Sequence, residues 1–468
     1  MLEKPTAKSS HPMTMTRRLA AWIGDFAESE VSARTAERAR AILLDTLACA
    51  LYAKSDEKSQ PAFHALPRLG GNEDCTIIGS RKRSSLPVAA FANGVLIRLL
   101  DLNDTYSGPR NIGHPSDNIA VALAAAEIAD RSGKDLIKAI RLGYEIYGRL
   151  VDIGNPDSPW DHVTTSGLVA AAIAGWLLRL PAEQLTNALA LSAMHCATLG
   201  QVRAGQVSGA KSIANATVAH TACLLTLLAA EGTTGPEEAL EGPRGYAKLI
   251  LDGADFADFF KEGDEDRLLS VGLKQYPCFA LAQGPISAAV ELRQRISRPE
   301  QLQRLKVVLA DTKPALLRLG DEHGRKPTSS EAADHSIYFI VAAALLDGRF
   351  GLDQLRAGRW RDRDVIDLIA RMDFAVDASL QPKTALPCRL EAVLADGGRC
   401  IVERQCTPGF ASNPLSWDQV VAKFRSCASG VLDDRSQSEA ISCINEIDRL
   451  PSVRTLLKFL VADDPGRD

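Results

Sequence analysis

The stretch SDNIAVALAAAEIADRSG (116–133) contains an almost uninterrupted run of apolar residues, most of them alanine. A soluble helix that is apolar on nearly every side must be buried, either inside a bundle of helices or at an interface between subunits. The small alanine side chains let neighbouring helices approach closely. The stretch therefore predicts a compact domain built from many helices.

Similar helical patterns recur along the first 260 residues. They cover residues 32–53, 87–102, 133–153, 165–180, 181–200 and 211–232. The pattern changes from about residue 270, where strands are predicted at 305–312, 385–395 and 399–407, the last two forming a hairpin around Asp-Gly-Gly. Helices are predicted at 286–296, 331–348 and 363–372, and again at 416–430 and 452–462. This order predicts a mainly α protein with a smaller α+β domain.

The length of 468 residues exceeds what one hydrophobic core usually supports, so two domains are expected. We expect a disordered N-terminal tail (1–15), a helical domain in two segments (16–270 and 407–468) and an α+β domain (271–406). The tail lacks the apolar core of a secretion signal, and no uncharged apolar run reaches the roughly 18 residues that span a bilayer.

The composition, 46% hydrophobic and 24% charged, is typical of a soluble globular protein. A net charge of -4 without any Lys/Arg-rich block argues against nucleic acid and membrane surfaces as partners. The ten cysteines form no CxxC pair, which argues against a zinc site or a cysteine-held iron–sulfur cluster. Many of them lie in apolar runs, which indicates a reducing, cytoplasmic compartment.

The loop DLNDTYSGPRNIGHPSDN (101–118) places many ionisable groups between two apolar segments, so it is either a solvated loop or part of a site. Asp101 follows an apolar helix, and His114 lies two residues before Ser116, a candidate N-cap. His162 precedes a second alanine-rich helix, and Lys211 lies in the first turn of a third.

A helix N-terminus attracts anions through its free N–H groups and partial positive charge. The same field disfavours protonated histidine and lysine and lowers their pKa. If these helix ends converge, they form a positive pocket with acids and bases that suits a polycarboxylate. Each group taken singly has an ordinary explanation as a cap, a surface group or a solvated residue. His195 and His220 lie in apolar helices and are expected in the core, whereas His11, His64 and His323 are expected in the tail or on the surface.

Several ordered motifs resemble the MmgE/PrpD family, from about residue 16 to 465. They are DLNDTY followed by GHPSDN, then WDHVTTSG, QVRAGQVSGAKSIANA, AAEGTTGPEEALEG, LKQYPCFALAQGPI and DHSIYFIVAAALLDG. The family includes 2-methylcitrate dehydratase, cis-aconitate decarboxylase and iminodisuccinate epimerase. D-x-N-D-T-Y, HPSDN and QVRAG are most similar to the 2-methylcitrate dehydratase branch.

The resemblance implies a large helical domain, an inserted α+β lid domain, a homodimer and a pocket between the domains. Because the cysteine spacing offers no ligand set for an iron–sulfur cluster, we expect an enzyme that needs no cofactor or metal. The motif positions imply catalytic roles for Asp101, His114, His162, Lys211 and Lys274, and substrate-binding roles for Thr105, Arg203, Tyr276 and Tyr338. One departure concerns the tyrosine that relatives often carry at the position of Phe339. Tyr338 precedes it. Because each residue along a helix is rotated by about 100° from the last, the hydroxyl of Tyr338 need not replace that of the family tyrosine.

The resulting hypothesis is dehydration of a β-hydroxy polycarboxylate such as 2-methylcitrate or citrate. Lys211, Lys274 and Arg203 would hold carboxylates and stabilise the negative charge that develops. His162 or Asp101 would remove the proton, and His114 would protonate the leaving hydroxyl. Decarboxylation and epimerisation pass through similar carbanion-like species and stay open. A carboxylate-binding protein without activity and a purely structural helical scaffold are the alternatives of another class.

Overall fold

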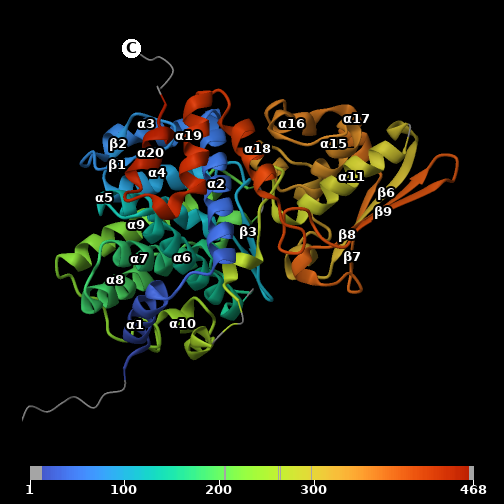
Figure 1. Cartoon of the computed structure of the whole chain (residues 1–468). Helices are drawn as coiled ribbons and strands as arrows, with labels where there is room; N and C mark the ends of the chain where they lie inside the picture. The colour runs from blue at the N-terminus through green and yellow to red at the C-terminus, as the bar shows by residue number, and fades with distance from the viewer. Residues whose placement is uncertain are drawn as a thin grey trace, which may run out of the picture.

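The computed structural model describes residues 13–155, 157–204, 207–261, 263, 265–296 and 298–462. Residues 1–12 of the predicted tail (1–15) lie outside the described residues. The first helix, α1, begins at Met15, the last residue of that predicted tail. The protein is mainly α, as predicted, with small sheets. Figure 1 shows a body of packed helices beside a smaller region that contains the largest sheet.

The helical body follows the predicted apolar segments. Its main helices are α1 (Met15–Glu28), α2 (Ala33–Lys54), α3 (Gln60–Leu69), α4 (Leu86–Arg98), α5 (Ile119–Ile128), α6 (Gly133–Ile153), α7 (Ser166–Leu177), α8 (Ala182–His195), α9 (Ala210–Ala230) and the short α10 (Tyr246–Leu249). Nearly every residue of α5 and α7 is buried, as their composition predicts. Ser32 caps α2 as expected, because its side chain accepts a hydrogen bond from the Thr35 backbone N–H.

The second region contains a four-stranded sheet in the order β7-β6-β8-β9. Its strands are β6 (Leu302–Ala310), β7 (Met372–Asp377), β8 (Cys388–Leu394) and β9 (Arg399–Arg404). β8 and β9 form the predicted hairpin, whereas β7 is a strand that the sequence interpretation missed, and it pairs parallel with β6. Helix α11 (Gln283–Arg295) packs on β8 and β9, and α15 (Ile337–Asp347) packs between α11 and α17 (Arg363–Ile369). The remaining helices of this region are short: α12 (Lys313–Leu316), α13 (Glu322–Arg325), α14 (Ser330–Ala333) and α16 (Leu352–Arg356).

The chain then returns to the helical body through α18 (Trp417–Ala428), α19 (Asp434–Asn445) and α20 (Arg454–Leu457). Helix α18 packs along α2, and the C-terminal helices lie among the N-terminal ones in Figure 1. The domain boundaries at residues 270 and 406 stay predictions.

Two minor sheets complete the strands. One pairs β1 (Cys75–Thr76) with β2 (Arg83–Ser84), and the other has the order β4-β3-β5, with β3 (Thr105–Ser107), β4 (Ile112–Gly113) and β5 (Val271–Gly272). Thr105 pairs with Gly272 in an antiparallel register, which places the residues just before β3 beside those just after β5. Gly272 is required there, because a Cβ would lie 2.6 Å from the ring of Phe410.

Two predictions about single residues are wrong. Ser116 does not cap α5. It lies within a 3₁₀ turn (Pro115–Asn118), and its hydroxyl accepts a hydrogen bond from Asn103 at 3.0 Å. His195 is not in the core but exposed in the last turn of α8, because the apolar pattern ends before the helix does.

By length and composition, one described helix, α9, could cross a membrane. Half of its most apolar window is buried inside the protein, where α9 packs against α4, α7 and α8. This packing accounts for the buried part of its apolar surface.

Candidate active site

Asp101 is the centre of the predicted site. It lies three residues beyond α4 with a φ of +50°, a conformation that residues with a side chain rarely adopt. Its buried carboxylate accepts from Lys274 Nζ at 2.6 Å and from Lys211 Nζ at 3.1 Å, and it also pairs with Arg98. Burial alone would raise the pKa of this carboxyl, but the three cations hold it well below its usual range. Asp101 is therefore a carboxylate that gathers cations.

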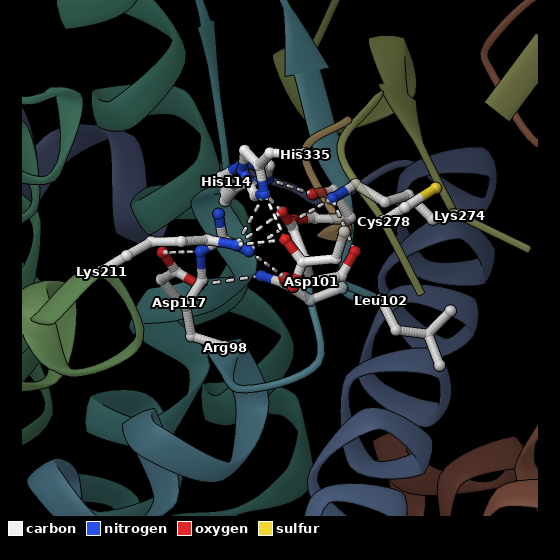
Figure 2. A network of polar contacts seen from close by, with 12 residues as sticks. Arg98, Asp101, Leu102, His114, Asp117, Lys211, Lys274, Cys278 and His335 are labelled. Carbon is white, nitrogen blue, oxygen red and sulfur yellow. Dashed lines mark hydrogen bonds and ion pairs between the residues drawn. The ribbon is translucent and has the colours of Figure 1, made fainter. Parts of the chain in front are cut away.

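Figure 2 shows the lysines reaching Asp101 from opposite sides. Lys211 comes from the first turn of α9, as predicted, and Lys274 follows β5. Both side chains are almost fully buried. Burial lowers the pKa of Lys274, although Asp101 opposes that shift. The short β3–β5 pairing brings Lys274 to a residue more than 170 positions away.

The second region adds Asp334 and His335, which precede α15. His335 Nε2 lies 3.4 Å from an Asp101 carboxylate oxygen, and its Nδ1 pairs with Asp334. Lys211 Nζ lies 3.5 Å from Asp334 and 3.3 Å from His335 Nδ1. Burial lowers the pKa of His335 to about 4. The centre is therefore closed by residues from both regions of the chain.

His114 and His162 form a second part of the site, with ring centroids 5.4 Å apart. His114 Nδ1 lies 2.6 Å from the carbonyl oxygen of Asp104. A carbonyl only accepts, so Nδ1 carries the proton and the neutral ring leaves Nε2 as the acceptor. Burial, with Arg98 and Lys274 adding to it, lowers the pKa of His114 well below its usual range.

His162 is in the same tautomer, with its proton on Nδ1. Its Nδ1 lies 3.3 Å from the Asp161 carboxylate, while its buried Nε2 has no partner among the residues described. Burial lowers the pKa of His162 to about 3, against the opposing effect of Asp161. Both rings are thus neutral near pH 7 and present Nε2 as a base.

Arg203 pairs with Asp161 through two bonds, Nε–Oδ2 at 2.5 Å and Nη2–Oδ1 at 3.2 Å. Burial raises the pKa of the Asp161 carboxyl, but His162 and Arg203 outweigh that effect, and the net pKa is lowered. In this structure Arg203 therefore orients the carboxylate that orients His162. Its predicted contact with a substrate carboxylate stays a prediction.

The other predicted binding residues lie in different surroundings. Thr105 is buried in β3, and its hydroxyl has no partner among the described residues. Tyr276 is partly buried, and its backbone N–H donates to Gln283. Tyr338 lies in α15, its ring covered by Arg325 with 4.2 Å between guanidinium carbon and ring centroid. The structure brings neither tyrosine into the Asp101 cluster, and their substrate-binding roles stay predictions.

Family models match nearly the whole chain. The MmgE/PrpD N-terminal domain matches residues 17–258, and the MmgE/PrpD C-terminal domain matches residues 276–448. The chain belongs to the MmgE/PrpD family.

The curated relatives that this chain resembles include cis-aconitate decarboxylases and 2-methylcitrate dehydratases. A cis-aconitate decarboxylase of Aspergillus terreus is 24% identical over 493 residues, covering 98% of each chain. The human cis-aconitate decarboxylase is 24% identical over 477 residues, covering 97% of this chain and 95% of the relative. A 2-methylcitrate dehydratase of Cupriavidus necator is 28% identical over 397 residues, covering 77% of this chain and 78% of the relative.

Five residues of this MmgE/PrpD site were not predicted from the sequence: Arg98, Asp104, Asp117, Asp334 and His335. The sequence contained a sign of Arg98, because it is the single charge in the apolar run VLIRLL. In the structure its side chain is 1% exposed. Asp334 and His335 open the motif DHSIYF but carried no assigned role. Burial raises the pKa of Asp104 to about 6 and that of Asp117 to about 7.

Among the described residues, Asp101, Asp334 and His335 form a group whose ligand atoms lie within 4.8 Å of one another, a separation that a metal ion could bridge. The same atoms already contact Arg98, Lys211 and Lys274. A divalent cation would have to displace these positive side chains or lie against them, at a high electrostatic cost. The charges of this MmgE/PrpD centre suit an anionic ligand better than a metal ion.

Proposed function

We propose that the protein is a lyase that dehydrates a β-hydroxy polycarboxylate such as 2-methylcitrate or citrate without a metal or cofactor. One observation carries the proposal: three buried cations surround Asp101 near two neutral imidazoles, and the buried Nε2 of His162 has no partner among the described residues. The dehydratase names of relatives at 28% identity support the reaction type.

The charges support a polyanionic substrate. The cations Arg98, Lys211 and Lys274 face the carboxylates of Asp101 and Asp334, which leaves an excess of positive charge. Asp117 offsets only part of this excess near pH 7, because burial raises its pKa to about 7. Buried charges without full compensation are costly, so a bound carboxylate would relieve an existing penalty.

In the proposed mechanism His162 Nε2 removes the proton from the carbon beside a substrate carboxylate. The electron pair of that C–H bond forms the C=C bond as the neighbouring C–O bond breaks, and hydroxide leaves as water after accepting a proton. Lys211 and Lys274 stabilise the negative charge on the carboxylate during the step. Asp101 is the weaker candidate for the base, because three cations occupy its oxygens.

Two groups are candidates for the acid that protonates the leaving hydroxyl. Neutral His114 must first gain a proton on Nε2, which burial and nearby cations oppose. Lys274 already carries its protons and has a lowered pKa, and two of its three N–H groups donate to Asp101. We assign the acid to Lys274, because its ammonium already carries the proton that His114 would first have to gain.

Decarboxylation of a cis-aconitate-type substrate is the second candidate. The relatives with that name cover almost the whole chain, and the reaction also leaves a carbanion that the lysines would stabilise. Chelator-treated protein should be incubated with 2-methylcitrate, citrate, cis-aconitate and iminodisuccinate, and products followed by NMR. Release of carbon dioxide would favour decarboxylation, inversion alone epimerisation, and binding without turnover a carboxylate-binding protein. Loss of turnover on chelation, with recovery on adding a metal, would overturn the metal-free proposal.

We propose that the α+β region is a lid over the pocket. Asp334 and His335 belong to this region, yet they contact Lys211 and Asp101 of the helical body. Opening would therefore remove a histidine and an acid from the centre. Small-angle scattering should show a more compact protein when tricarballylate, a non-reacting tricarboxylate, is bound. An unchanged radius of gyration with saturating ligand would contradict a moving lid.

We also propose a cytoplasmic homodimer. Helix α9 exposes Ile213, Leu224 and Leu228, each more than 40% accessible, on one face, and exposed Leu199 lies in the preceding segment. Residues spaced by 11 and 4 share a helix face, so they form an apolar strip that a second copy could cover. Light scattering should give twice the mass of one chain, and Leu224→Glu with Leu228→Glu should halve it. A monomeric wild type would rule the dimer out.

A further inference from the structure

A lysine from the C-terminal part of the chain lies directly behind the candidate site. Lys423 is in α18, which packs along α2. Its ammonium donates to Asp45 Oδ1 at 2.7 Å, to the Lys274 carbonyl oxygen at 2.7 Å and to the Leu102 carbonyl oxygen at 3.2 Å. An ammonium has three N–H donors, so each of them has an acceptor.

The two carbonyl groups belong to the two segments that build the centre. Leu102 directly follows Asp101, and Lys274 is the residue whose own ammonium donates to Asp101, to the carbonyl at 2.9 Å and to the carboxylate at 2.6 Å. Lys423 therefore joins the backbones of these segments, while Lys274 joins their functional groups. The segments are otherwise connected through the short pairing of β3 with β5.

The backbone conformation at Asp101 gives such a clamp a role. Its φ of +50° is unfavourable for a residue with a side chain, and such a conformation persists only where the surroundings fix it. Lys274 fixes the Asp101 carbonyl and Lys423 fixes the next one. Asp45 is fully buried in α2 and balances the charge of Lys423, so the clamp is anchored to the helical body.

We propose that Lys423 is a positioning residue for catalysis, which sets the separation of Asp101 and Lys274 without touching the substrate. The inference rests on the proposed function, in which Lys274 stabilises charge and donates a proton. It assigns α18 a catalytic purpose beyond packing. A shift of the reacting groups by about 1 Å lowers a rate by roughly 100-fold, so the clamp should affect kcat more than KM.

Removing Lys423 alone would leave the buried Asp45 carboxylate unpaired, and the protein could fail to fold. The test therefore uses the paired variant Asp45→Asn with Lys423→Met, in which both buried charges are removed together. Val420→Ala is the matched control, because Val420 is fully buried one turn earlier on α18 and contacts neither carbonyl through a hydrogen bond. Lys423→Arg keeps the charge but not the compact arrangement of three donors.

The paired variant should lose about 10- to 100-fold in kcat with KM changed less than about threefold, using whichever substrate the wild type converts. Val420→Ala should lose comparable thermal stability but keep kcat, and Lys423→Arg should lie between the paired variant and the wild type. Near wild-type kcat in a folded paired variant, or an equal loss in Val420→Ala, would overturn the proposal. If the paired variant does not fold, Lys423→Arg is compared with Val420→Ala, and equal kcat values would overturn it.

A crystal structure separates this inference from the proposed function. If the wild type converts no substrate, the proposed function fails, and the clamp is tested by the geometry of the paired variant. The hydrogen bond of Lys274 Nζ to the Asp101 carboxylate should be lost or lengthened. Retention of the 2.6 Å bond would overturn the positioning role.

Discussion

Replacing His162 with glutamine tests the electrostatics of the site through the pH dependence of stability. An unfolded histidine titrates near pH 6.5, whereas burial lowers the pKa of folded His162 to about 3. Between these values the unfolded chain binds a proton that the folded protein does not. The stability that depends on the neutral ring is therefore complete above the unfolded pKa and is lost progressively as the pH falls toward the folded one.

The magnitude follows from linkage. When the pH is lowered from about 7.5 to about 5, His162 should lower the unfolding free energy of the wild type by about 2 kcal/mol. Asp104 and Asp117 act in the opposite direction, because burial raises their pKa values to about 6 and about 7 and the folded protein then binds the extra protons. The total slope is thus a poor measure, and only the difference between wild type and variant isolates His162.

Urea unfolding of substrate-free wild type, His162→Gln and His195→Gln should be measured at both pH values. The exposed His195 is the control, and its variant should follow the wild type. His162→Gln should lose about 2 kcal/mol less than the wild type on acidification. Equal losses in the wild type and His162→Gln would show that the ring is not held neutral. As the proposed base, His162 should also support catalysis, so its replacement should lower kcat by about 10²- to 10⁴-fold. A variant with wild-type rate would contradict that assignment.

Three further changes have distinct expected outcomes. Lys211→Met should lower kcat/KM by about 10²- to 10³-fold because it removes a cation at the substrate carboxylate, and an effect no larger than that of the exposed control Lys134→Met would contradict that role. Arg203→Met should lower kcat more than it raises KM if Arg203 acts through Asp161, whereas a large rise in KM alone would indicate direct substrate binding. Phe339→Tyr should lower stability by about 1–3 kcal/mol in thermal unfolding without changing the product, because Phe339 is fully buried against Phe350 and Trp360; a changed product would show that this position faces the substrate.

The helices were predictable because their signal is local. Apolar segments located α2 and α4 to α9, and the Asp-Gly-Gly turn between two short strand patterns located the β8–β9 hairpin. The strands β3, β4 and β5 have only two or three residues, so no periodicity exists to detect. Their pairing is a tertiary event, and that pairing brings Lys274 to Asp101.

The site was predictable where a charge interrupts an apolar context. Asp101, His114, His162 and Lys211 mark helix ends. The structure brings Lys211 to Asp101 and His114 to His162, while their catalytic roles stay predictions. Lys423 lies in an ordinary amphipathic helix, where a lysine is usually a solvated residue. Its burial depends on α18 packing against α2, a contact between residues nearly 380 positions apart. No local pattern carries that information.

The cationic cluster does not decide between dehydration and decarboxylation, because in both reactions negative charge builds up beside a carboxylate. The two reactions differ in which bond of the substrate breaks and in whether the protein removes or supplies a proton at carbon. Dehydration needs a C–H bond at His162 Nε2 and a hydroxyl near an acid, whereas decarboxylation needs a proton donor for the carbanion that remains when carbon dioxide leaves. Neutral His162, oriented by Asp161 and Arg203, suits proton removal and cannot donate from Nε2 until it is protonated. A rate that rises as the pH increases through the pKa of His162 in the substrate complex would therefore favour dehydration, and a rate that rises on acidification would favour decarboxylation.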